Sequence, residues 1–138
     1  MFRYSVTRDI AAPPEKVWAV LSDARRLEDG FGITRIDGTL APGATIKVFS
    51  EVSPGRAFPV RVTTFTAPAR MVWTGGMPLG LFRGVRTFTL APLSGSGTRF
   101  TMEEVFSGPL SGLIGRSMPD LQPSFETFAT ALKRNAET

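Results

Sequence analysis

The chain has 138 residues, 42% of them apolar and 20% charged, so we expect a single domain over residues 1–138 that buries roughly two-thirds of its unfolded surface. It contains no cysteine and no histidine, which excludes disulfides, thiolate chemistry and histidine as a general base or metal ligand. The net charge of +4 comes from scattered arginines and lysines that never run longer than two, so we expect a basic solvated surface and no nucleic-acid partner.

No stretch of the chain approaches the run of about 18 apolar residues that a membrane-spanning helix needs. We therefore expect no integral membrane segment. The opening residues MFRYSVTRDI also lack the apolar core of a signal peptide, which favours a cytoplasmic protein.

The first predicted element is a strand, because FRYSVTRDI alternates apolar and polar side chains. A helix follows in AAPPEKVWAVLSD, where Pro13 and Pro14 suit a helix start. Ser22 and Asp23 indicate a break and a new N-cap, so we expect a second short helix that ends at Gly30.

From about residue 33 the apolar side chains recur at every second position, which is typical of strands. We expect six further strands near 33–38, 44–52, 57–66, 69–75, 84–91 and 97–107. Segments rich in glycine, proline and serine separate them, and such short connections favour antiparallel neighbours.

The last third of the chain carries a helical pattern. Its apolar residues are spaced by three or four, and they are Leu110, Ile114, Met118, Leu121, Phe125, Phe128 and Leu132. Pro119 and Pro123 interrupt this stripe, because each removes a backbone donor. We predict a short helix or turn over 109–117 and a long helix from residue 119 or 120 to 136.

These elements predict an α+β fold, in which the long last helix lies across the concave face of a curved, seven-stranded antiparallel sheet accompanied by two short helices. PPEKVWAVLSD after the first strand and GTRFTMEEVFSGPL before the last helix resemble the START-like helix-grip superfamily. The resemblance is to its polyketide cyclase/dehydrase and lipid-transport (SRPBCC) group, over about residues 3 to 135. It implies a cavity between sheet and helix that binds a hydrophobic ligand, but a fold alone does not define an activity.

The last predicted strand places one acidic residue on an apolar face. Alternation puts Glu104 on the same side as Phe100 and Met102. A carboxylate withdrawn from water is costly unless it is paired, and such a setting suits a general acid or a ligand anchor. The alternative is an ion pair with Arg61 or Arg86 that only stabilises the sheet.

The candidate ligand-binding residues lie on the alternating strands, the loop 76–83 and the last helix, and each of the apolar ones could equally belong to the core. They are Phe58, Val60, Trp73, Met77, Leu81, Phe82, Arg86, Phe88, Phe100, Met102, Leu121 and Phe125. The single tyrosine, Tyr4, could also donate a hydrogen bond. In relatives the position of Arg86 is often histidine, so the resemblance does not carry histidine-dependent chemistry over to this chain.

The loop 76–83 places large apolar side chains, Leu79 among them, between glycines. We interpret it as a mobile apolar rim that admits a ligand, because pockets for small molecules are mostly apolar and methionine adapts to varied ligands. A loop folded over the core, a homodimer contact and a docking patch for a partner protein are the alternatives.

Three functions remain open at this point. The one we favour is binding or transport of a small hydrophobic or amphipathic ligand, such as a lipid, polyketide or isoprenoid. The second is a cyclase or dehydratase in which Glu104 is the acid or base and Arg61 or Arg86 stabilises an enolate oxygen. The third is a protein-interaction module. No metal or other cofactor is expected, because adjacent carboxylates on a strand point apart and phosphate-loop motifs are absent.

Overall fold

The computed structural model describes residues 2–138. Within that range the chain forms seven strands, four α-helices and one 3-10 turn. The strands are β1 (Phe2–Ile10), β2 (Ile33–Asp37), β3 (Thr45–Ser50), β4 (Ala57–Thr66), β5 (Arg70–Gly76), β6 (Arg83–Pro92) and β7 (Thr98–Ser107). The helices are α1 (Pro14–Leu21), α2 (Ala24–Leu27), α3 (Ser111–Ser117) and α4 (Gln122–Ala136), and the 3-10 turn is η1 (Pro78–Gly80).

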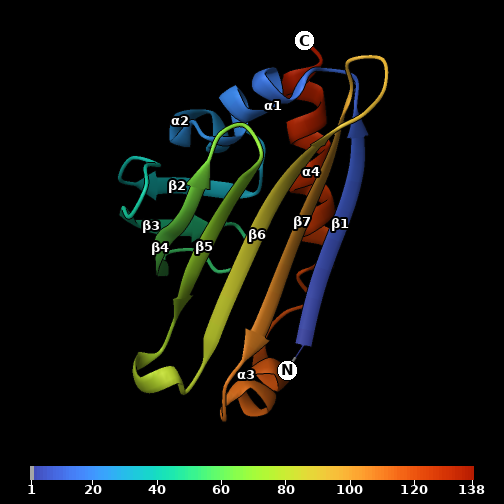
Figure 1. Ribbon diagram of the computed structural model, residues 1–138. Helices are drawn as coiled ribbons and strands as arrows, with labels where there is room; N and C mark the ends of the chain where they lie inside the picture. The colour runs from blue at the N-terminus through green and yellow to red at the C-terminus, as the bar shows by residue number, and fades with distance from the viewer. Residues whose placement is uncertain (1) are drawn as a thin grey trace.

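All seven strands form one antiparallel sheet in the order β1-β7-β6-β5-β4-β3-β2. The sheet curves, and α4 lies behind its β7 and β1 side in Figure 1, where it packs against β1, β7 and α1. Loop η1 and helix α3 lie together at the end of the molecule opposite the C-terminus. This arrangement confirms the predicted helix-grip architecture.

The core between the sheet and α4 is filled by aromatic rings. Phe128 of α4 lies with its ring centroid 5.7 Å from that of Phe88, 6.2 Å from Phe100 and 5.1 Å from Phe31. All four side chains are at most 2% exposed, and full burial of such a ring stabilises the fold by about 2 kcal/mol. The middle of the interior is therefore packed with side chains.

The break between α3 and α4 lies where the two prolines predicted it, but α4 begins later than expected. Met118 is extended, with ψ 144°, because the proline that follows disfavours a helical conformation. Asp120 then accepts a hydrogen bond from the backbone N–H of Gln122 at 3.0 Å, which stabilises the first turn of α4. The helix consequently starts at Gln122 and not at residue 119 or 120.

The remaining predicted bounds need small corrections. Each strand differs from its expected bounds by at most two residues, the largest difference being the end of β3 at Ser50. Asp23 caps α2 as predicted, with its Oδ1 3.0 Å from the N–H of Arg25, but that helix ends at Leu27, before Gly30. None of the helices within residues 2–138 is long and apolar enough to cross a membrane.

Candidate functional site

One row of residues crosses the inner face of the sheet, which is the face that α4 covers. Tyr4 on β1 pairs in register with Glu104 on β7, and Glu104 pairs with Arg86 on β6. The row continues to Trp73 on β5 and Val62 on β4. Antiparallel pairing thus gathers four residues with polar groups, from four different strands, on an otherwise apolar surface.

Arg86 and Glu104 form an ion pair at the centre of this row. The Nε and Nη2 atoms of Arg86 both donate to Oε1 of Glu104, at 3.0 and 2.6 Å. The two side chains are only 22% and 14% exposed, and the guanidinium lies 5.0 Å from the ring centroid of Phe125 on α4. The second oxygen, Oε2, accepts no hydrogen bond from the described part of the chain. Glu104 is therefore a carboxylate held by one oxygen and free at the other.

Arg61, the other expected partner of Glu104, does not reach it. Arg61 pairs in register with Thr74, one position away from the inward-facing pair of Val62 and Trp73, so it lies on the outer face of the sheet. Its side chain is exposed. The suggested partnership of Arg61 with Glu104 is wrong, and Arg86 alone makes the ion pair.

Trp73 brings an unused hydrogen-bond donor to the same row. Its side chain is 3% exposed and packs edge-on against Phe88, with ring centroids 4.9 Å apart. The indole Nε1 is buried, and no acceptor for it exists among residues 2–138. A buried donor without a partner costs about 1–3 kcal/mol, so such groups call for an explanation.

Two glycines lie side by side on the inner face, next to the polar row. Gly75 of β5 pairs with Gly84 of β6, and Gly84 pairs with Phe106 of β7. A Cβ atom on Gly84 would lie 3.2 Å from Oε2 of Glu104 and 3.1 Å from the Phe106 ring. The absence of a Cβ at Gly84 thus lets the carboxylate of Glu104 lie close to the backbone of β6. Sequence reasoning treated the two glycines as flanks of a loop, although an inward-facing glycine within a strand indicates a close approach of other groups.

The end of the sheet beyond these glycines is closed by stacked rings. Phe106 stacks on Phe2 at 4.8 Å and on Phe82 at 5.5 Å. The loop that carries Phe82 is attached to the turn before α3, because the N–H of Leu110 donates to the carbonyl of Leu81 at 2.9 Å. The β5–β6 loop and α3 consequently form one border of the inner face (Figure 1).

The predicted ligand-binding residues fall into three groups. Those that surround the ion pair of Glu104 are Trp73, Arg86 and Phe125. Those buried or partly buried against the core are Val60, Phe88, Phe100, Met102 and Leu121. Those at the surface end of the sheet are Phe58, Met77 and Leu81, which are exposed, and Phe82, which is partly buried. The structure brings the first group together and spreads the other two around it.

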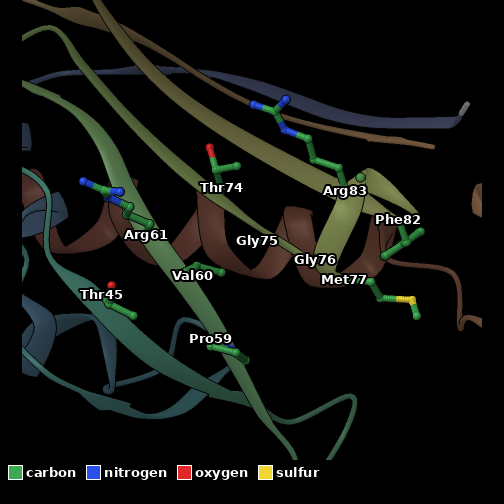
Figure 2. Close-up of a pocket in the computed structure, with 11 residues that line it drawn as sticks. Thr45, Pro59, Val60, Arg61, Thr74, Gly75, Gly76, Met77, Phe82 and Arg83 are labelled. Carbon is green, nitrogen blue, oxygen red and sulfur yellow. The ribbon is translucent and has the colours of Figure 1, made fainter.

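A separate hollow of about 480 Å³ opens at the surface beside the β5–β6 loop (Figure 2). Its lining includes the outer-face residues Arg61, Thr74 and Arg83, together with Met77 and Phe82. Neither arginine forms an ion pair with a carboxylate of the described chain. No residue of α4 lines this hollow, although the inward-facing positions Val60 and Gly75 reach it. A second hollow, of about 360 Å³, lies along α4.

A curved antiparallel sheet with a C-terminal helix packed against it is the helix-grip fold. The chain belongs to the family of polyketide cyclase/dehydrase and lipid-transport proteins, whose model matches residues 1–137. Within residues 2–138, no group of three or more acidic residues is placed to hold a metal ion.

Solved structures show the same fold. Protein MLL2253 from Mesorhizobium loti has a TM-score of 0.74 at 21% identity, over 97% of this chain and 96% of its own. The Aha1 dimer from Colwellia psychrerythraea, solved in solution, has a TM-score of 0.74 at 20% identity, over 99% and 97% of the chains. DynU16, a putative protein in the dynemicin biosynthetic locus, has a TM-score of 0.72 at 21% identity, over 99% of this chain but 47% of its own. Among curated proteins, none matches this sequence.

Proposed function

We propose that the protein binds a small hydrophobic or amphipathic ligand, of the lipid, polyketide or isoprenoid kind, on the inner side of its sheet. Trp73, Arg86 and Glu104 would hold the polar end of that ligand. The family and its fold support a ligand-binding or cyclase role. The observation that supports a polar contact with the ligand is the buried indole N–H of Trp73, which has no acceptor within the described chain.

The donors and acceptors of this row define the chemistry of the ligand's polar end. Trp73 offers an N–H, and the free Oε2 of Glu104 accepts a hydrogen bond. Glu104 already balances the charge of Arg86, so the row has no surplus cation for an anionic head group. A neutral oxygen function fits best: a carbonyl that accepts from Trp73, or a hydroxyl that also donates to Glu104.

The packing of the interior supports one direction of entry. The middle of the interior is occupied by the rings of Phe88, Phe100 and Phe128. At the border formed by the β5–β6 loop and α3, Phe82 and Leu121 are only partly buried. A ligand that enters there displaces these two side chains and meets Glu104 beside the paired glycines. The exposed Met77 and Leu81 would then act as the rim.

Native mass spectrometry of the gently purified protein is the direct test. We expect a bound small molecule that is lost on denaturation, or binding of an added fatty alcohol or polyphenol. Trp73→Phe keeps an aromatic ring but removes the N–H, and it should weaken binding about tenfold. Trp18→Phe is the matched control, since Trp18 packs on Phe65 with centroids 5.2 Å apart, outside the polar row. A protein that binds none of these ligands, or equal losses in both variants, would contradict the proposal.

A second candidate, an enzyme of the cyclase type, is favoured by the geometry of Glu104. The ion pair with Arg86 fixes one oxygen and leaves the other without a hydrogen-bond donor in the described chain, so that Oε2 could serve as a general base. Oε2 would take a proton from a carbon next to a substrate carbonyl, and the resulting enolate oxygen would accept hydrogen bonds from Trp73 or Arg86.

The same carboxylate distinguishes an enzyme from a binding protein. In the enzyme, Glu104→Gln abolishes turnover of a poly-β-ketone while the ligand still binds. Glu103→Gln is the control, because Glu103 occupies the next position of β7 and faces Arg3 on the outer side. If the wild-type protein binds the poly-β-ketone and leaves it chemically unchanged, this result would contradict the catalytic role and remain consistent with the binding role.

A further inference from the structure

The β5–β6 loop holds large apolar side chains in solvent. Leu79 is 95% exposed, Met77 43% and Leu81 38%. Leu113 of α3 is 66% exposed, and the two segments are joined by the hydrogen bond from Leu110 to Leu81. Met77, Leu79, Leu81 and Leu113 therefore form an apolar tip at the end of the molecule where η1 and α3 lie (Figure 1).

The backbone at the centre of the apolar tip is in an unfavourable conformation. Leu79 has φ 62°, and within residues 2–138 only Leu79 and Ser96 adopt a positive φ without being glycine. This left-handed region costs leucine more than asparagine or glycine. Backbone hydrogen bonds such as the one from the N–H of Met77 to the carbonyl of Phe82, at 2.7 Å, hold the loop in this shape, but the Leu79 side chain gains no burial there. Such a combination indicates a partner outside the chain.

Unpaired cations flank the apolar tip. Arg61 and Arg83 line the adjacent hollow, and Arg116 lies on α3 one turn after Leu113. None of the three forms an ion pair in the described chain. Asp120, which caps α4, is one negative charge against these three positive ones. The surface around the apolar tip is therefore positively charged.

We propose that this end of the molecule docks on an anionic lipid bilayer. Leu79 enters the boundary between head groups and acyl chains, where apolar side chains flanked by cations are stabilised. Arg61 and Arg83 contact lipid phosphates at the hollow that they line together with Thr74 (Figure 2).

A second copy of the chain fits this surface less well than a bilayer does. A two-fold interface sets a patch against itself, so the arginines around both apolar tips would face one another. An anionic surface instead balances their charge. The proposal does not depend on the polar row of Trp73, Arg86 and Glu104, because the residues that carry it lie on the loop, on α3 and on the outer face of the sheet.

Sedimentation with vesicles tests the proposal. Wild-type protein should bind vesicles of phosphatidylcholine mixed with phosphatidylglycerol, bind pure phosphatidylcholine weakly, and dissociate as salt is added. Leu79→Asn, which suits the left-handed backbone, should lower the partition coefficient at least about tenfold. Arg61→Gln and Arg83→Gln should each lower it about fivefold.

The matched control is Arg70→Gln, which removes an exposed, unpaired arginine at the opposite end of β5 and should leave partitioning unchanged. Trp73→Phe should also leave it unchanged, which separates this proposal from the ligand site. Equal binding by wild type and Leu79→Asn would overturn the proposal. A concentration-dependent dimer that Leu79→Asn dissolves, without any binding to vesicles, would overturn it in favour of a second copy.

Discussion

The ion pair between Arg86 and Glu104 makes a sharp prediction about stability. Glu104→Gln removes the negative charge but keeps the size of the side chain, and it leaves the guanidinium beside Phe125 without its counter-charge. Arg86→Met leaves the carboxylate on an apolar face without either of its two donors. Both changes should lower the free energy of unfolding, and the second should lower it more.

The magnitude follows from the partial burial of the pair. Exposed pairs contribute about 0.2–1 kcal/mol, and removing one partner of a fully buried pair costs about 3–5 kcal/mol. Side-chain exposures of 22% and 14% place this pair nearer to the buried limit. Because the remaining solvent screens the pair, we expect less than the buried limit: Glu104→Gln should lower the free energy of unfolding by about 2 kcal/mol and Arg86→Met by about 3 kcal/mol. The double variant should also cost about 3 kcal/mol, which gives a coupling of about 2 kcal/mol.

Urea unfolding followed by tryptophan fluorescence measures all four proteins of this double-mutant cycle, with the free energies extrapolated linearly to zero urea. An unchanged slope between variants shows that the unfolded state is the same in each. A coupling below about 0.5 kcal/mol would show that the two changes act independently. The pair would then behave as an exposed one, and the inner face would be wetter than the burial of these side chains indicates.

Three further predictions concern the core, the loop and the surface charges. Phe128→Ala should lower the free energy of unfolding by about 4 kcal/mol in the same urea assay, because it opens a cavity among the packed rings. Gly76→Ala should lower the free energy of unfolding clearly more than Gly80→Ala. Both glycines have a positive φ, but a Cβ on Gly76 would lie 2.1 Å from a carbonyl oxygen, whereas one on Gly80 would meet nothing within 4 Å. Equal losses of stability in the two variants would contradict this reasoning. The hydrogen bond from Arg8 is the main cause that lowers the pKa of Glu126 below its ordinary value of 4.5. Its stabilisation is present above pH 4.5 and is lost as the pH falls through the lowered pKa, so the melting temperature of Glu126→Gln should depend less on pH in that acidic range than that of wild type.

Local patterns were sufficient to predict the order of the elements. The alternation in the β7 segment placed Glu104 among inward-facing apolar residues, and the same face is buried in the structure. Turn residues marked the ends of the strands to within two residues. These signals depend on neighbours in sequence, namely on side-chain direction along a strand and on the backbone preferences of glycine and proline.

The partners within the candidate site could not be predicted in the same way. Which arginine meets Glu104 depends on the register between strands, and that register is set by non-local pairing of whole strands. The sequence left Arg61 and Arg86 as equal alternatives, although only Arg86 faces inward. The missing acceptor of Trp73 is likewise a property of the packed interior, because it depends on every group that surrounds the indole.

The β5–β6 hairpin links the two proposals through strand alternation. Its inward positions present Trp73 and Arg86 to the interior, its outward positions present Thr74 and Arg83 to the surface hollow, and its turn carries Leu79. An apolar ligand that left a bilayer at the apolar tip would therefore pass the border of the inner face without crossing water. This coupling has a specific consequence. Leu79→Asn should slow the transfer of ligand from vesicles and leave the affinity for dispersed ligand intact. Trp73→Phe should lower the affinity for dispersed ligand and leave the rate of transfer from vesicles intact. Variants that impair both equally would show that the hairpin is one structural unit and not two separable sites.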